Sequence, residues 1–168
     1  MTAQRQESYR KGPGVALFAL LAAIFVLIGL DRPATGSTTE RIVVNRYSGL
    51  AIEGFDPVAY FADAEALRGL PDFEAAQAGA VWRFRSASNR DAFVAHPEIY
   101  GPQFGGYDPI DVARGVPFAG NPHFFVVVDQ RLYLFGREES RSAFAADPAK
   151  FLKDARARWP GLQNTLAQ

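Results

Sequence analysis

The residues from Gly54 to Phe151 contain the same unit twice, about fifty positions apart. Most of the matching positions are glycines, prolines and aromatic residues, which fix turns and fill cores. The matched segments are Gly54-Phe55-Asp56-Pro57-Val58 with Gly106-Tyr107-Asp108-Pro109-Ile110, Gly69-Leu70-Pro71-Asp72-Phe73 with Gly120-Asn121-Pro122-His123-Phe124, and Trp82-Arg83-Phe84 with Tyr133-Leu134-Phe135. Further along, Arg90, Ala92, Phe93, Pro97 and Tyr100 match Arg141, Ala143, Phe144, Pro148 and Phe151. Two copies are too few for a solenoid, so we expect one duplicated domain whose halves share a core.

Each copy predicts a short helix, a β-hairpin and a second helix. Asp56-Pro57 and Asp108-Pro109 are helix-start signals, because the carboxylate accepts from free N–H groups and proline needs no donor. The first helices are expected over 56–61 and over 108 to Gly115. The hairpins are expected over 73–84, with a turn at Ala78-Gly79, and over 124–135, with a turn at Asp129-Gln130. The second helices are expected from Ser86 or Ser88 to Ala95 and over 137–146. A last helix is expected from Asp147-Pro148. The predicted fold class is α+β, with the two hairpins pairing into one antiparallel sheet covered by helices.

Composition excludes several classes of function. The chain has no cysteine, which removes disulfides, thiol chemistry and cysteine-based zinc sites. Its 18 basic and 18 acidic residues are interleaved, so no nucleic-acid partner is expected.

The N-terminal part predicts a membrane anchor. Residues 12–30 are apolar and long enough to approach the ~30 Å hydrocarbon core as a helix. Arg5, Arg10 and Lys11 precede them, which places residues 1–11 in the cytoplasm and the domain in the periplasm of a bacterial inner membrane. A linker is expected over 31–45 and the domain over 46–161, with copies at about 54–100 and 106–151. The alternative is a signal peptide cleaved near Gly36.

Few polar side chains are candidates for chemistry. His96 and His123 are the only histidines, and a hard-metal site would need them to converge with a carboxylate such as Asp111 or Asp72. Asp56 and Asp108 form a possible acid–base pair, but their place before proline at a helix start explains them without catalysis.

Four aromatic residues are the candidate ligand pocket. Trp82 and Tyr133 hold equivalent positions on the two hairpins, and Phe55 and Tyr107 precede the two first helices. Together they would line a shared groove for a small apolar ligand or a peptide. Packing in the core explains them as well.

The chain resembles the YHS domain family over nearly all of its length after the linker. The likeness is carried by Ala51-Ile52-Glu53-Gly54-Phe55-Asp56-Pro57-Val58-Ala59-Tyr60-Phe61, by Trp82-Arg83-Phe84-Arg85-Ser86-Ala87-Ser88-Asn89-Arg90-Asp91-Ala92-Phe93 and by Pro97-Glu98-Ile99-Tyr100. Pro102-Gln103-Phe104-Gly105-Gly106-Tyr107, Leu132-Tyr133-Leu134 and Arg158-Trp159-Pro160 extend it. It is most similar to the exported or membrane-anchored bacterial members.

The resemblance implies a fold rather than a metal activity. Metal-binding relatives carry cysteines at the positions of Ala59, Arg85 and Asn89, which correspond to Asp111, Gly136 and Ser140 in the second copy of this chain. Exported relatives carry a cysteine at the position of Asp108. Oxygen ligands do not replace thiolates for soft ions. We therefore expect no cofactor and a non-enzymatic binding or accessory module, anchored in the lipid bilayer, with a small molecule or a protein as partner. The alternative is a small enzyme or hard-metal protein that uses Asp and His side chains between the copies.

Overall fold

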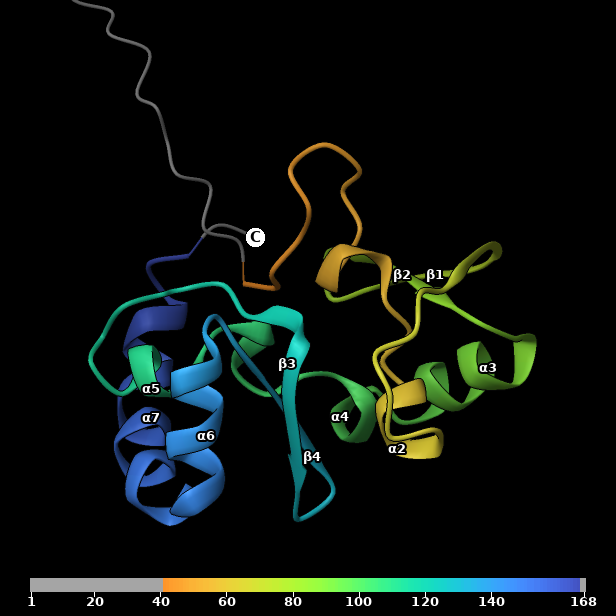
Figure 1. Cartoon of the computed structure of the whole chain (residues 1–168). Coiled ribbons are helices and arrows are strands. Elements are labelled where there is room, and N and C mark those ends of the chain that lie inside the picture. The colour runs from red at the N-terminus through yellow and green to blue at the C-terminus, as the bar shows by residue number, and fades with distance from the viewer. Residues whose placement is uncertain (1–40, 167–168) are drawn as a thin grey trace, which may run out of the picture. The chain divides into compact units, whose positions relative to one another are not determined.

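The computed structural model describes residues 41–166, so the predicted membrane-spanning segment, residues 12–30, lies outside the described residues. No helix between residues 41 and 166 is long and apolar enough to cross a bilayer. The described part mixes helices with short antiparallel hairpins, which confirms the α+β class (Figure 1). The first copy contains η1 (Ile52–Gly54), α2 (Ala59–Ala62), β1 (Leu70–Gln77), β2 (Ala80–Phe84), α3 (Ala87–Ala95) and α4 (Pro97–Tyr100). The second contains η2 (Gln103–Gly106), α5 (Pro109–Val112), β3 (Asn121–Val128), β4 (Arg131–Phe135), α6 (Glu138–Ala146) and α7 (Pro148–Gln163).

Both hairpins form where the sequence predicts them. Their two-residue turns are Ala78-Gly79 and Asp129-Gln130, and all four residues have a positive φ, as the favoured hairpin turn requires. The register of each hairpin shifts at the same place, between Leu70 and Glu74 and between Asn121 and Phe125. The duplication therefore extends to the irregularities of the strands.

The prediction of one antiparallel sheet is wrong, because the hairpins form two separate two-stranded sheets. The open edge of β2 is occupied by a parallel bridge between Leu50 and Val81, and that of β4 by a parallel bridge between Pro102 and Leu132. The other edges belong to β1 and β3, each of which contains a proline and a register shift. Proline and irregular register both prevent edge-to-edge pairing of strands.

The helix starts are only partly as predicted. α5 begins at Asp108-Pro109, where the Asp108 carbonyl accepts from the N–H of Val112 at 2.9 Å, but it ends at Val112 rather than at Gly115. The predicted helix from Asp56 begins later, at Ala59, because the first carbonyl to accept helical hydrogen bonds is that of Val58. α3, α6 and the start of α7 are confirmed, and α7 continues through Pro160 to Gln163.

The matched aromatic residues occupy equivalent core positions. The ring of Phe93 lies 4.8 Å from that of Trp82 and 5.2 Å from that of Phe84. In the second copy the ring of Phe144 lies 5.0 Å from Tyr133 and 5.1 Å from Phe135. All of these side chains are almost fully buried.

The two halves share part of their core, as the duplication predicts. Leu132 and Leu134 of β4 belong to the same hydrophobic cluster as Trp82 and Phe93 of the first half. The buried Tyr60 of α2 adds a polar link, because its hydroxyl donates to the carbonyl of Pro122 at 3.0 Å. Burial raises the pKa of the Tyr60 hydroxyl, so it stays protonated and keeps this donor role.

The described end of the expected linker contacts the domain. Val44 forms an antiparallel bridge with Ala51, and the N–H of Val43 donates to the carbonyl of Gly105 at 2.8 Å. Residues 43–44 therefore cross from the first half to the start of the second.

Candidate functional site

The carboxylate of Asp56 is fully buried and joins three parts of the first half. Its Oδ1 accepts from the N–H of Val58 at 2.8 Å, which holds the turn before α2. Its Oδ2 accepts from the N–H of Arg85 and from the side-chain amide of Asn89, both at 2.7 Å. The carboxylate thus ties the entry to α2 to the connection between β2 and α3.

Asp108 repeats this arrangement in the second half. Its Oδ1 accepts from the N–H of Ile110 at 2.9 Å and its Oδ2 from the N–H of Gly136 at 3.0 Å, while the Ser140 hydroxyl also hydrogen-bonds it. Burial raises the pKa of Asp108, although the amides of Gly136 and Ile110 act in the opposite direction. Both carboxylates have internal hydrogen-bond partners on each oxygen, which supports a structural role for each.

Asp111 is buried in an ion-pair cluster. Its carboxylate accepts from Arg137 at 2.5 Å and from Arg114 at 3.3 Å. The Arg137 guanidinium also lies 4.6 Å from the ring centroid of Phe118. Two arginines therefore neutralise this carboxylate from the solvent side.

The structure does not bring the candidate metal ligands together. The exposed His96 has its Nδ1 3.5 Å from the carboxylate of Glu98, whereas His123 packs edge-on against Phe55 with ring centroids 5.0 Å apart. Asp111 lies with its arginines, and Asp72 lies exposed on β1. Over residues 41–166 no group of three His, Asp or Glu side chains is placed to hold a metal ion.

The four predicted pocket aromatics are distributed over three hydrophobic clusters. Phe55 and Trp82 belong to the first cluster, Tyr133 to the second and Tyr107 to the third. All four are nearly fully buried by core packing. Of the four, Trp82 lines a pocket of about 330 Å³, and the other three do not line this pocket.

The pocket beside Trp82 lies where the first half meets the segment that enters the second. Trp82 and Phe93 form its buried inner wall, and their rings are 4.8 Å apart. Pro97, Pro102 and Phe104 form other apolar parts of the wall. The polar side chains that reach it are Gln77, Glu98 and Gln103. An apolar pocket with a few polar side chains is the usual character of a small-molecule site.

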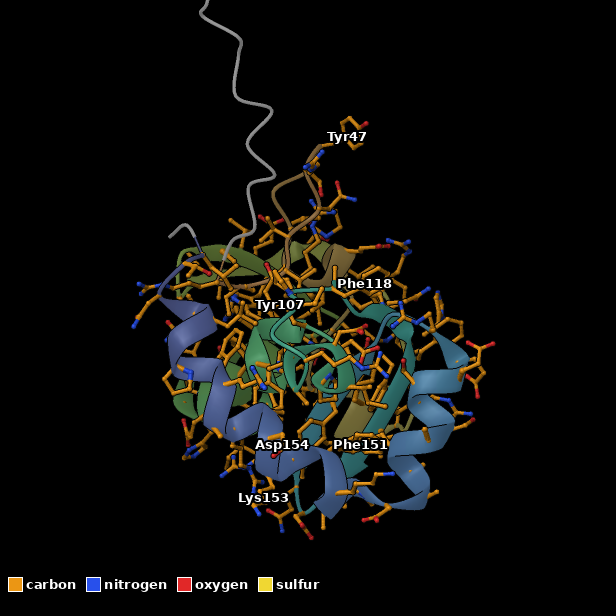
Figure 2. The ribbon with its side chains drawn as sticks, turned by 90° about the vertical axis from the view of Figure 1, so that its left-hand side faces the viewer. Tyr47, Tyr107, Phe118, Phe151, Lys153 and Asp154 are labelled. Carbon is orange, nitrogen blue, oxygen red and sulfur yellow. The ribbon has the colours of Figure 1, made fainter. Side chains whose placement is uncertain are left out.

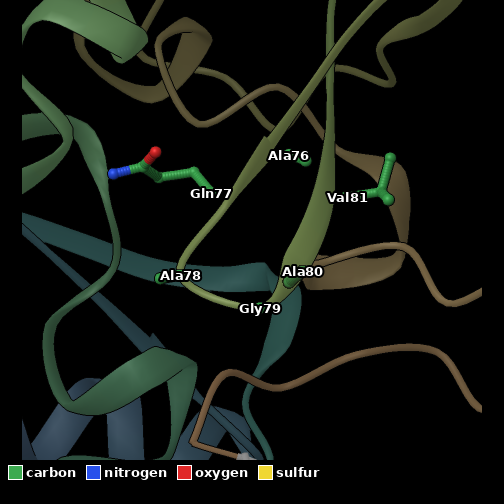
Figure 3. Close-up of a pocket in the computed structure, with 6 residues that line it drawn as sticks. All are labelled: Ala76, Gln77, Ala78, Gly79, Ala80 and Val81. Carbon is green, nitrogen blue, oxygen red and sulfur yellow. The ribbon is translucent and has the colours of Figure 1, made fainter.

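The β1–β2 turn forms one side of this pocket. The indole N–H of Trp82 donates to the carbonyl of Gln77 at 3.0 Å, so the polar atom of the indole is satisfied within the hairpin. Figure 3 shows that the Gln77 side chain leaves the hairpin on the side opposite to Val81. Gln77 and Ala78 also line a second, shallower hollow of about 290 Å³ around the turn itself.

Sequence reasoning found Trp82 but missed the rest of the wall. Pro97, Gly101, Pro102 and Phe104 come from a stretch of proline, glycine and aromatic residues that runs from the end of the first copy into the start of the second. Such a stretch signals a connection with a fixed path. Nothing in the sequence indicates which part of the first half this stretch covers, because that depends on tertiary contacts.

No match to this chain is found among family models, curated proteins or solved structures.

Proposed function

We propose that this chain is a membrane-anchored module of the YHS type that binds a small apolar ligand, without catalysing a reaction, on the periplasmic side of a bacterial inner membrane. The observation that carries the proposal is the apolar pocket beside Trp82. The membrane attachment and the periplasmic side follow from the expected anchor at residues 12–30, and the YHS type follows from the family resemblance.

The lining of the pocket favours an apolar, ring-sized ligand over a charged one. Trp82, Phe93 and Phe104 supply aromatic surface, and no basic side chain between residues 41 and 166 belongs to the lining. Among the described lining residues only Glu98 is charged, and its side chain is 64% exposed beside His96. A ligand here would contact the first hairpin and the segment that opens the second copy at once.

The proposal can be tested by fluorine NMR on the full chain in lipid nanodiscs, with both tryptophans replaced by 5-fluorotryptophan. Trp82 lines the pocket. Trp159, on α7, packs against Phe104 and Tyr107 and is not itself a lining residue. Toluene is the probe. We expect the Trp82 resonance to shift in a saturable manner and by clearly more than that of Trp159, which lies behind Phe104.

Two matched variants locate the effect. Gln77→Tyr places a bulky ring at the wall of the pocket and should abolish the shift, whereas Asp72→Tyr changes an exposed residue of the same strand that does not line it. Equal shifts of both tryptophans, or a Trp82 shift that survives Gln77→Tyr, would contradict binding at this pocket.

A further inference from the structure

A turn near the start of the described domain holds one aromatic side chain away from the protein. Residues 45–49 form this turn, which we call the Tyr47 loop. The N–H of Asn45 donates to the carbonyl of Leu50 at 2.9 Å, and the N–H of Gly49 donates to the carbonyl of Asn45 at 2.8 Å. The Oδ1 of Asn45 accepts from the N–H groups of Tyr47 at 3.0 Å and Ser48 at 3.1 Å. The backbone of the loop is therefore fixed by its own hydrogen bonds.

The side chain of Tyr47 is 99% exposed, well above any other exposed large hydrophobic side chain in residues 41–166. Figure 2 shows it at the tip of the loop, directed away from the body of the domain. Arg46 beside it is also exposed. The Tyr47 ring is therefore outside the core and accessible to a partner outside the domain, with an apolar body and a polar hydroxyl.

Chain length and geometry point to the bilayer as that partner. Residues 31–40 alone separate the expected anchor from the described domain, and ten residues span at most about 35 Å when fully extended. The loop begins four residues after Arg41, and Figure 1 shows it projecting from the end of the domain at which the described chain begins. Tyrosine is enriched at the level of lipid headgroups, and arginine extends its charge toward phosphates there.

We propose that the Tyr47 loop rests on the surface of the membrane in which residues 12–30 are anchored. The Tyr47 ring lies at the headgroup level, and Arg46 pairs with lipid phosphate. This contact orients the domain, because the opposite end, which carries Lys153 and Asp154 of α7, then faces the aqueous side (Figure 2). The inference rests on the membrane anchor of the proposed function and adds a second point of attachment to it.

The absence of cysteine allows a direct test with single labels on the full chain. Ser48→Cys places a fluorophore beside Tyr47 and keeps the ring, and Lys153→Cys places the same fluorophore at the opposite end. Each labelled chain is reconstituted into phosphatidylglycerol-containing vesicles that carry a nitroxide on the lipid headgroup. We expect quenching at position 48 to exceed that at position 153 several-fold.

A further variant tests the role of the ring itself. Adding Arg46→Ser and Tyr47→Ser to the Ser48→Cys chain should reduce quenching to the level at position 153. Because both side chains are exposed, these changes should leave the melting temperature unaltered. Equal quenching at positions 48 and 153 in a chain that stays with carbonate-washed vesicles would overturn the loop contact alone. Release of the chain by the wash would overturn the anchor, and the loop contact with it.

Discussion

Gly105→Ala should destabilise the domain far more than Gly79→Ala, although both glycines have left-handed backbones, with φ of +63° and +79°. A Cβ on Gly79 would meet no atom within 4 Å, because this residue lies at the tip of the first hairpin. A Cβ on Gly105 would overlap the carbonyl oxygen of Arg41. In the first copy the equivalent residue, Glu53, adopts the same conformation with its side chain in solvent.

The expected magnitudes follow from these contacts. A left-handed alanine costs about 1–2 kcal/mol, and roughly 0.4–1 kcal/mol of this is offset because alanine restricts the unfolded chain. Gly79→Ala should therefore cost about 1 kcal/mol in total. Gly105→Ala must also displace residues 41–43, which breaks the hydrogen bond from Val43 to Gly105, worth about 1 kcal/mol. The lost packing of Val43 adds about 1 kcal/mol more, which gives about 3 kcal/mol overall.

Urea unfolding of the full chain in detergent, followed by tryptophan emission, measures both changes in the free energy of unfolding. The wild-type chain and Gly49→Ala, at another open left-handed position, serve as controls. Equal losses for Gly105→Ala and Gly79→Ala would show that residues 41–43 do not pack on Gly105. The crossing of this segment between the two halves would then be wrong.

Three further outcomes are expected. Phe93→Ala and Phe144→Ala should each lower the free energy of unfolding, measured with denaturant, by about 3–5 kcal/mol, because both rings are buried at equivalent positions. If one loss falls in this range and the other lies well outside it, the two positions are not equivalent. Because burial raises the pKa of Asp108, its stabilising contribution is fully present below about pH 4 and is lost as the pH rises through the raised pKa. Asp108→Asn should therefore flatten the decrease of the free energy of unfolding with pH, and an unchanged slope would refute this role of Asp108. Tyr60→Phe should lower the free energy of unfolding by about 1 kcal/mol, because the hydrogen bond between the halves is lost. The control is Tyr100→Phe, which changes a partly buried ring packed on the same cluster, and a loss for Tyr60→Phe no larger than that of the control would count against the link.

The local elements of the fold could be predicted because the duplication reports them twice. Matched Gly, Pro and aromatic positions flank both hairpins and lie in α3 and α6, so the same elements were predicted in each copy. The Asp-Pro pairs predicted capping carboxylates, and Asp108 does accept from the N–H of Ile110. The longer reach of Asp56 to Arg85 and Asn89 was not predictable, because it depends on how the hairpin folds back.

The pairing of strands and the pocket depended on tertiary contacts. The sequence does not show that Leu50 and Pro102 occupy the open edges of β2 and β4, so a single sheet was expected. The positive φ of Ile52 and Phe104 was also hidden, because a bulky side chain gives no sign of a left-handed turn. Trp82 was recognised as a candidate site residue, but its neighbours in the pocket come from the β1–β2 turn, α3, α4 and the segment that leads into η2.

The location of a bound ligand is the most direct test of the binding function. Bromobenzene matches the apolar lining of the pocket, and its bromine can be located by anomalous diffraction in crystals of the full chain. We predict a bromine peak against Trp82, between Phe93 and the segment from Pro102 to Phe104. An empty pocket at a saturating concentration, or a peak only at another place on the domain, would contradict the proposal.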